Sequence, residues 1–467
     1  MGLQIYNTLS GRKESFVPIE QGKVGLYECG MTVYDRCHVG HARSLLIFDI
    51  IYRYLTFRGY DVVFVRNFTD VDDKIIQKAQ TEGVSAAALA ERYIEEFYHD
   101  SQLLDLLPPT HEPKATDHIA EMIELISRLE EKGLAYQMDG DVFFYVDRFP
   151  GYGKLSGKRI EELEAGARVE VDLRKRRPMD FALWKKSKAG EPAWDSPWGK
   201  GRPGWHIECS AMSRKYLGQP FDIHGGGMDL IFPHHENEIA QSEGAFDLPL
   251  ARYWLHNGFV NINREKMSKS LGNFFTIQEV LDKHDARALR QYLLSSHYRS
   301  PLDFSLQGLE EAEKGVSRLY ETLERLSRLV SDSELADAAA LDDFRAEMDD
   351  DFNTPRSLAL IFEEVRALNR LADEGKTEQL RPRLRALKKM AEVLGLLEEP
   401  QAFFRKKKDR WLKSHGLSTE AIDELLRQRN RARSDKRWHE ADRIRSELKD
   451  KGIVVEDSPH GTTWRVQ

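Results

Sequence analysis

Two short segments carry residue types suited to phosphate chemistry. His38-Val39-Gly40-His41 brings two imidazoles and a glycine to the start of an expected helix, and Lys266-Met267-Ser268-Lys269-Ser270 follows about 230 residues later. The imidazoles can stabilise charge developing on an α-phosphate, Gly40 lets a nucleotide approach the backbone, and the lysines suit a pyrophosphate leaving group. Either segment alone is also typical of an ordinary surface loop or helix start. Together they predict a nucleotide-activating site.

Four further residues could hold a metal ion. Cys29 ends an expected strand nine residues before His38, Cys209 lies in Trp205-His206-Ile207-Glu208-Cys209, and His234 and Glu238 have the i, i+4 spacing of one helix face. Two thiols, one imidazole and one carboxylate favour Zn²⁺. From the residues alone, one alternative to a metal site stays open, namely two buried cysteines and a solvated acidic helix. Cys29 belongs to the same sheet edge as the His38 helix start, so a metal there would touch a substrate.

The elements that must position these residues begin with a strand–helix–strand unit. Residues 24–30 and 61–68 are short β-branched and aromatic runs typical of buried strands, and residues 40–59 between them have helical apolar spacing that ends at Gly59. A crossover of this length predicts a parallel sheet. The unit has no G-x-G-x-x-G, so the dinucleotide-binding fingerprint is absent.

The rest of the chain changes from mixed to helical character. We expect residues 85–135 to be helical, 139–149 to form a strand, and 150–204 to be an irregular insertion rather than core. Sheet-like patterns return at 220–227 and 254–262. From about residue 305 helical periodicity dominates, as in 380–397, and a basic helical segment runs to about 450 before a tail that predicts a small hairpin.

Composition limits the classes of protein. The length of 467 residues predicts two to four domains, and 41% of the residues are apolar and 31% charged. The sequence contains no run of 18 or more apolar residues, which a membrane-spanning helix would need. The first residues do not resemble a secretory signal, and three cysteines cannot cross-link a chain of this size. We therefore predict a cytoplasmic protein without membrane association. Cys37 is not among the four candidate ligands above and is expected to serve packing.

The charge is unevenly distributed. The net charge is −8, but residues 401–450 hold 15 Lys and Arg against 9 Asp and Glu, a local charge of +6 that leaves −14 for the rest. An acidic body with one basic helical end can bind a polyanion locally, although a solvated helix face gives the same count. Within that end, residues 431–442 combine cations, Trp438 and carboxylates, a mixture that suits unpaired RNA bases.

Several motifs resemble one known family. The pairing of His38-Val39-Gly40-His41 with Lys266-Met267-Ser268-Lys269-Ser270 resembles class I aminoacyl-tRNA synthetases. The segments around Cys29 and Cys209 and the long stretch 224–238 resemble the cysteinyl-tRNA synthetases, and the likeness runs essentially end to end. Met31 departs from the family's motif, in which proline is frequent at this position. The resemblance implies an α/β fold with a Rossmann-type parallel-sheet catalytic domain containing an insertion, then a C-terminal helical bundle and a small anticodon-binding domain.

The resemblance also implies roles for single residues and for segments. One zinc ion per chain, which would also take the substrate thiolate, is expected at Cys29, Cys209, His234 and Glu238. Thr32, Trp205 and His224 are expected to line the cysteine pocket. ATP, with Mg²⁺, is expected to meet His38, Gly40, His41, Asp229 and Lys269. The catalytic residues are expected to be His38, His41, Lys266 and Lys269. The anticodon contacts are expected to be Arg433, Trp438 and Asp442.

The implied domains are residues 1–120 and 204–262 (two halves of the Rossmann-type catalytic domain), 121–203 (connective insertion), 263–310 (stem-contact region bearing the lysine motif), 311–398 (helical bundle) and 399–467 (anticodon-binding domain). The implied partners are L-cysteine, ATP and tRNA(Cys), and we expect the protein to be a monomer. No side chain need act as a covalent nucleophile, because positioning and electrostatics suffice. An apolar pocket separates cysteine from serine by only about 1–3 kcal/mol, whereas a zinc–thiolate bond changes the type of bond.

Two rival functions remain open. One is a ligase that activates cysteine in the same way but joins it to an aminosugar; such ligases are expected to lack the basic C-terminal helices that this chain has. The other is an inactive, zinc-braced RNA-binding protein, which would have no use for pyrophosphate lysines. For residues 431–442 the open alternative is an ordinary helix with one core tryptophan.

Overall fold

The structure is a computed structural model of the 467-residue chain. It describes residues 2–157, 175–262, 265–266, 274–330, 336–458 and 461–466. Within these ranges no helix combines the length and the apolar character needed to cross a bilayer.

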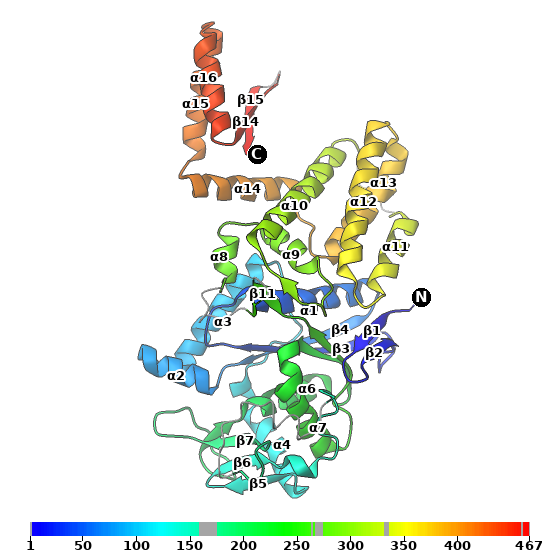
Figure 1. Cartoon of the computed structure of the whole chain (residues 1–467), viewed down its shortest axis with the longest axis vertical. Helices are drawn as coiled ribbons and strands as arrows, with labels where there is room; N and C mark the ends of the chain where they lie inside the picture. The colour runs from blue at the N-terminus through cyan, green and yellow to red at the C-terminus, as the bar shows by residue number, and fades with distance from the viewer. Residues whose placement is uncertain are drawn as a thin grey trace.

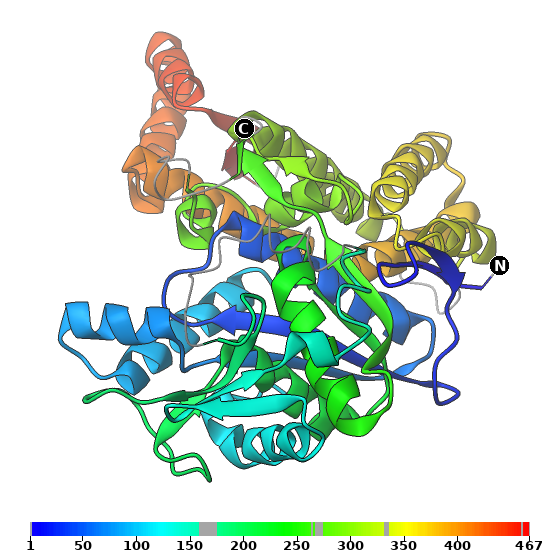
Figure 2. The same ribbon diagram turned by 60° about the horizontal axis from the view of Figure 1, so that its bottom comes forward.

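A parallel sheet of four strands forms the centre of the molecule (Figures 1 and 2). Its order is β10-β9-β3-β4, with β3 at Lys23–Thr32, β4 at Asp61–Thr69, β9 at Phe221–Gly227 and β10 at Ala251–Asn257. Helix α1 (Val39–Phe57) joins β3 to β4, so the predicted strand–helix–strand unit is confirmed. The next strand of this sheet, β9, pairs with the other side of β3. That reversal creates a crevice at the carboxyl ends of β3 and β9, where ligands of such sheets bind.

Both faces of this sheet are covered. Val24 and Leu26 of β3 share a core with α1, whereas Tyr27 and Cys29 share a second core on the opposite face. The second core is formed with helices α4 (Ile119–Glu131), α6 (Trp205–Leu217) and α7 (Glu236–Phe246). Strands buried on both faces carry nearly continuous apolar runs, which explains why β3 and β4 were recognisable from the sequence.

The insertion is more ordered than we expected. It contains an antiparallel sheet with the order β5-β6-β7-β8, formed by β5 (Ala135–Met138), β6 (Asp141–Phe144), β7 (Phe181–Lys186) and β8 (Gly201–Pro203). The prediction that residues 150–204 are irregular and outside the core is therefore wrong for β7 and β8. Leu183 and Trp184 are fully buried, and their core includes Val142 and Phe144. An apolar run of only four residues is too short for periodicity to identify a strand.

Three other predicted elements differ in extent. The predicted helical region 85–135 divides into α3 (Ala86–Leu103) and α4, because Pro108 and Pro109 interrupt it and the following residues run beside β4. The strand predicted at 139–149 ends with β6, since the 3₁₀ turn η2 (Val146–Arg148) follows. The stretch 254–262 divides at Gly258 into β10 and β11 (Val260–Ile262). A Cβ at Gly258 would lie 2.5 Å from the Ser300 carbonyl oxygen, so the chain turns closely there.

A small sheet and a helical bundle follow. Strand β11 pairs with β12 (Glu265–Lys266) and β13 (Leu302–Asp303), and α8 (Ile277–Leu281) and α9 (Ala286–Leu294) lie between those two strands in the sequence. The helical dominance predicted from about residue 305 is confirmed by α10 (Leu306–Ser327), α11 (Ala338–Met348), α12 (Thr354–Asp373) and α13 (Thr377–Val393). These helices share the α1 core, above the sheet in Figure 1.

The last segment projects from the bundle, at the upper left of Figure 1. It comprises α14 (Pro400–His415), α15 (Thr419–Ser434), α16 (Trp438–Asp450), β14 (Ile453–Ser458) and β15 (Gly461–Val466). The predicted hairpin is confirmed, because β14 and β15 pair antiparallel. A separate small core, which includes Leu412, Ile422, Leu426 and Ile444, holds these elements together.

The remaining elements complete the edges of the fold. An antiparallel hairpin at the N-terminal end joins β1 (Gln4–Asn7) to β2 (Arg12–Ser15). The others are α2 (Asp73–Glu82), the short turns η1 (Ala115–His118) and η3 (Met228–Leu230), and the wider turn η4 (Ile231–His235). η3 and η4 lead directly from β9 into α7, so they carry residues into the crevice beside β3.

Candidate metal and nucleotide site

Four predicted metal ligands from separate segments meet at the carboxyl edge of the sheet. The ligand atoms of Cys29, Cys209, His234 and Glu238 all lie within 4.8 Å of one another. Glu238 Oε1 lies 3.2 Å from Cys29 Sγ and 3.1 Å from His234 Nε2. Strand β3, helix α6, turn η4 and helix α7 supply one residue each. The structure thus brings together the four residues predicted to bind the metal, and their metal binding stays a prediction.

The chemistry of this group fits a zinc ion. All four side chains are buried. Burial lowers the pKa of His234 to about 3, so its imidazole is neutral, as metal binding requires. Burial also raises the pKa of the Cys29 and Cys209 thiols above the usual range. Thiols buried in this way become thiolates when a divalent cation offsets their charge, and thiolate, imidazole and carboxylate are the donor types that zinc takes in proteins.

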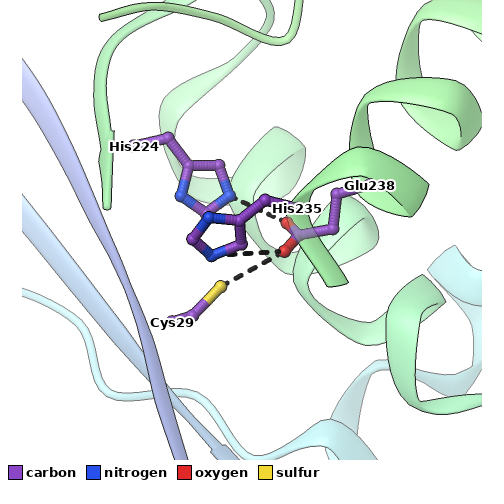
Figure 3. A group of neighbouring side chains, drawn as sticks. All are labelled: Cys29, His224, His235 and Glu238. Carbon is purple, nitrogen blue, oxygen red and sulfur yellow. Dashed lines mark hydrogen bonds and ion pairs between the residues drawn. The ribbon is translucent and has the colours of Figure 1, made fainter. Parts of the chain in front are cut away.

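A second group overlaps the first. Cys29, His224, His235 and Glu238 also place ligand atoms within 4.8 Å of one another, as Figure 3 shows. His224 Nε2 lies 2.8 Å from Glu238 Oε2, and His235 Nε2 lies 3.9 Å from Glu238 Oε1. His224 therefore contacts a predicted metal ligand, whereas we expected it to line the cysteine pocket. Its role toward cysteine stays a prediction.

A cavity of about 450 Å³ opens beside the first group. The predicted residues that line it are Cys29, Thr32, His38, Gly40, His41, Trp205 and Asp229. Trp205 is 37% exposed and its ring stacks on His234 at a centroid distance of 4.2 Å. Residues predicted for the metal, for the amino acid and for the nucleotide thus border a single space, at the switch point between β3 and β9.

The first two histidines cap helix α1 with their own rings. His38 Nδ1 accepts hydrogen bonds from the backbone N–H groups of Gly40 (3.0 Å) and His41 (3.4 Å). His41 Nδ1 accepts from the His38 backbone N–H at 3.2 Å, and the two rings stack at 3.6 Å. Each Nδ1 is therefore unprotonated, which leaves the proton on Nε2 as a donor. Gly40 is required here, because a Cβ would lie 2.7 Å from the His38 ring.

Both rings are neutral near pH 7. Burial lowers the pKa of His38 to about 4, although Asp229 opposes that shift, and burial lowers the pKa of His41 well below its usual value. Neutral Nε2–H groups at a helix N-terminus act as hydrogen-bond donors toward an anion rather than as full charges.

The segment after the lysine motif is tied to this helix start. Val39 N donates to Phe275 O at 3.1 Å, and Ile277 N donates to Cys37 O at 3.0 Å. Lys266 ends β12, but its side chain, and Lys269 entirely, lie outside the described residues. The hydrogen bonds nevertheless bring the chain that leaves the lysine motif next to His38, as a shared site requires.

Comparison with known proteins identifies the family. Residues 15–314 match the class I (C) tRNA synthetase catalytic domain, residues 343–398 the DALR domain, and residues 415–465 the cysteinyl-tRNA ligase anticodon binding domain. A cysteine–tRNA ligase of Geobacter metallireducens is 56% identical over 488 residues, with 100% of both chains covered. One of Geobacter sulfurreducens is 56% identical over 481 residues, also with 100% of both chains covered. The chain belongs to the cysteine–tRNA ligase family.

Solved structures of other class I synthetases share the fold. A Mycobacterium tuberculosis methionyl-tRNA synthetase superposes with a TM-score of 0.58 at 18% identity, covering 80% of this chain and 90% of that one. A leucyl-tRNA synthetase of Agrobacterium radiobacter gives 0.61 at 13% identity, covering 85% and 86%. The predicted α/β class with its Rossmann-type sheet and C-terminal helical domains is confirmed.

The family's anticodon-binding match includes the predicted RNA contacts. Trp438 is the first residue of α16 and is 58% exposed, so the alternative of a core tryptophan is wrong. Asp442 is exposed one turn later, on the same side of the helix. Arg433 Nη1 pairs with Asp457 Oδ2 at 2.8 Å. An exposed indole beside charged groups suits base stacking, and the anticodon roles of all three stay predictions.

Sequence reasoning missed the histidines behind the metal group. His206 Nδ1 lies 2.9 Å from His234 Nδ1, and His256 Nε2 lies 2.8 Å from His235 Nδ1. His206 and His235 stand directly beside predicted residues in the sequence, which was a usable signal. His256, on β10, gave none, because its contact with His235 exists only after the sheet has formed. Cys37 belongs to neither metal group and is buried in the α1 core, as predicted.

Proposed function

We propose that this chain activates L-cysteine with ATP and transfers it to the 3′ end of tRNA(Cys). In the first step the cysteine carboxylate attacks the α-phosphate and pyrophosphate leaves. In the second a ribose hydroxyl of the tRNA attacks the adenylate. The observation that carries the proposal is the common cavity. It is lined by Cys29, one of the four predicted metal ligands, and by His38 and His41 at the start of α1.

The side chains have distinct roles in this proposal. The Nε2–H groups of His38 and His41 donate to the α-phosphate as its charge grows, Asp229 meets the adenylate, and Lys266 and Lys269 stabilise the departing pyrophosphate. Thr32 and Trp205, which line the cavity, hold the amino acid, and His224, which is not among the described lining residues, acts through its contact with Glu238. Cys29, Cys209, His234 and Glu238 would hold the zinc ion, which would supply a Lewis acid that prefers a thiolate and so favours cysteine over serine.

The two rival functions are less well supported. An aminosugar ligase has no use for an anticodon-binding domain, yet residues 415–465 match one and present the exposed Trp438. An inactive RNA-binding protein has no use for neutral imidazole donors that line a cavity.

One zinc ion per chain and Mg²⁺ with ATP belong to the proposal. The monomeric state, the cytoplasmic location and the domain limits given above stay predictions.

Cysteine-dependent ATP–pyrophosphate exchange followed by acylation of purified tRNA(Cys) tests the proposed function. We expect exchange with cysteine, far weaker exchange with serine, and acylation of tRNA(Cys) but not of unrelated tRNAs. Exchange without tRNA acylation would favour the aminosugar ligase, and the absence of exchange would favour the RNA-binding protein.

Replacing His38 by asparagine should slow adenylate formation by about 10²–10³-fold, the usual cost of removing one donor to a developing charge. Asparagine is a good helix N-cap, so α1 should keep its start while losing the Nε2–H group. Single-turnover rates and the thermal unfolding midpoint measure the two effects. Since the pKa of His38 lies near 4, the wild-type rate should show no ionisation of this group between pH 6 and 8. A rate within twofold of wild type would remove His38 from the mechanism.

Replacing Lys269 by alanine should lower the rate of adenylate formation by roughly 10²–10³-fold and change cysteine binding little. The reason is that a contact made only with the departing pyrophosphate acts on turnover and not on ground-state affinity. Pre-steady-state kinetics separate the two quantities. Lys283→Ala, a lysine between α8 and α9, is the matched control. A weaker binding of cysteine at an unchanged rate constant would contradict the assignment.

A further inference from the structure

We propose that the chain contains a second metal position, which competes with the first for the same ion. The cavity position is Cys29, Cys209, His234 and Glu238; the inner position is Cys29, His224, His235 and Glu238. Each set has its ligand atoms within 4.8 Å of one another. Because Cys29 and Glu238 belong to both, one ion occupies one position at a time. The proposal rests on the metal binding in the proposed function, and extends it to residues outside the predicted ligand set.

The inner histidines are prepared to bind a cation. In the part of the chain that the structure describes, His235 Nε2 is buried, lies 3.9 Å from Glu238 Oε1 and has no hydrogen-bond partner. His224 Nε2 lies 2.8 Å from Glu238 Oε2, and Figure 3 shows both rings and Cys29 on the same side of that carboxylate. A buried nitrogen without a partner costs free energy that a bound cation would recover.

The two positions have parallel supports. His234 Nδ1 lies 2.9 Å from His206 Nδ1, and His235 Nδ1 lies 2.8 Å from His256 Nε2. His256 Nδ1 in turn lies 2.8 Å from Thr8 Oγ1. If each ligand histidine donates from Nδ1, its Nε2 keeps a lone pair directed at Glu238. Metal-binding histidines are usually oriented in this way by a partner on their other nitrogen. Each position thus has one supporting histidine. The cavity position alone gives no reason for the contact between His256 and His235.

The positions differ in access. Cys29, which both positions share, lines the cavity, and His234 of the cavity position packs under the ring of Trp205, which lines it too, so an ion there lies next to the substrate space. His224 and His235 are 0% exposed, are not among the described residues that line the cavity, and pack on Trp254 at centroid distances of 4.5 Å and 5.4 Å. The inner position is therefore shut off from the substrate space, whereas the cavity position adjoins it.

The donor atoms set the order of preference. The cavity position offers two thiolates and the inner position one, so Zn²⁺ should prefer the cavity position while Cys209 is available. When Cys209 is lost, the ion should move to the inner position, where it stays bound but cannot reach a substrate thiol. The inner position thus retains the metal in an inactive arrangement.

Cobalt-loaded full-length protein tests this competition. Wild type should bind one Co²⁺ with a thiolate-to-cobalt absorption band from two thiolates. Cys209→Ser should still bind one Co²⁺, more weakly and with about half that band, since one thiolate remains. His206→Asn should weaken Co²⁺ binding by about 10–100-fold in wild type and little in the Cys209→Ser background, because it supports only His234. His256→Asn should do the reverse.

The crossed pattern decides the outcome. Loss of Co²⁺ binding in Cys209→Ser, or equal weakening by His206→Asn and His256→Asn in both backgrounds, would overturn the inner position. Circular dichroism verifies folding, and Cys209→Ala is the second variant if serine prevents it. Cys37→Ser is the matched cysteine control and should keep the full band. The readout does not depend on catalysis: tight Co²⁺ binding without cysteine activation would refute the proposed function and leave the inner position standing.

Discussion

Replacing Cys209 by serine should lower kcat/KM for cysteine-dependent ATP–pyrophosphate exchange by more than about 100-fold, because even a residue that only supports a metal ligand is worth 10–100-fold. The substitution removes one of the two thiols that face the cavity position. Whether the ion then leaves or moves to the inner position, the substrate thiol loses its partner. The exchange assay with zinc-loaded protein measures this loss.

The fold should survive this change, since serine is close in size to cysteine and Cys209 lies within α6. Cys37→Ser is the matched control, because Cys37 is also buried but belongs to neither metal group. It should retain exchange near the wild-type level. Full exchange by Cys209→Ser, or by a wild-type preparation freed of metal, would show that cysteine is selected without the ion.

Removing residues 417–467 should abolish tRNA charging while leaving exchange intact. The cut after Gly416 keeps α14, whose Phe403 stacks on Tyr320 of the main core at 4.1 Å. It removes most of the separate small core formed around Ile422 and Ile444. The described residues that line the cavity all precede residue 275. Losing a single stacked base costs about 1–3 kcal/mol, and the removed segment carries all three predicted anticodon contacts.

Trp438→Ala should give a milder form of the same separation, with acylation weakened by roughly 5–150-fold and exchange unchanged. The loss should be smaller when the tRNA carries a mutated anticodon, because that contact is already missing. Trp464→Ala is the comparison for loss of an indole that is already engaged within the same segment. The Trp464 indole is hydrogen-bonded to Asp423 at 3.0 Å and lies under Lys408. Normal charging of tRNA(Cys) by the truncated chain would make the C-terminal segment structural and revive the aminosugar ligase.

Local patterns accounted for part of the fold. The strand–helix–strand unit was readable because β3 and β4 are continuous apolar runs and α1 has regular apolar spacing. The strands β7 and β8 were not, since the stretch that contains Leu183 and Trp184 is short and its partners lie some 40 residues away on β6. Burial of that kind is created by packing between segments and leaves no periodic signal in one of them.

The same limit applied to the candidate site: contiguous motifs could be recognised in the sequence, whereas contacts between distant segments could not. His38, Gly40 and His41 form a contiguous motif, and the structure adds a fact that spacing could not give, namely that each ring caps the helix and presents Nε2–H. The grouping of Cys29 with Cys209, His234 and Glu238 came from the family resemblance, because their positions in the chain are scattered. His256 could not have been found at all, since only the pairing of β10 with β9 brings it to His235.

X-ray absorption at the zinc edge, recorded before and after addition of L-cysteine, tests most directly whether the metal selects the substrate. The cavity position supplies sulfur from Cys29 and Cys209, so the free protein should show two sulfur neighbours around zinc. Cysteine should raise the number to three, and serine should leave it at two. An unchanged sulfur count on saturation with cysteine would contradict the account.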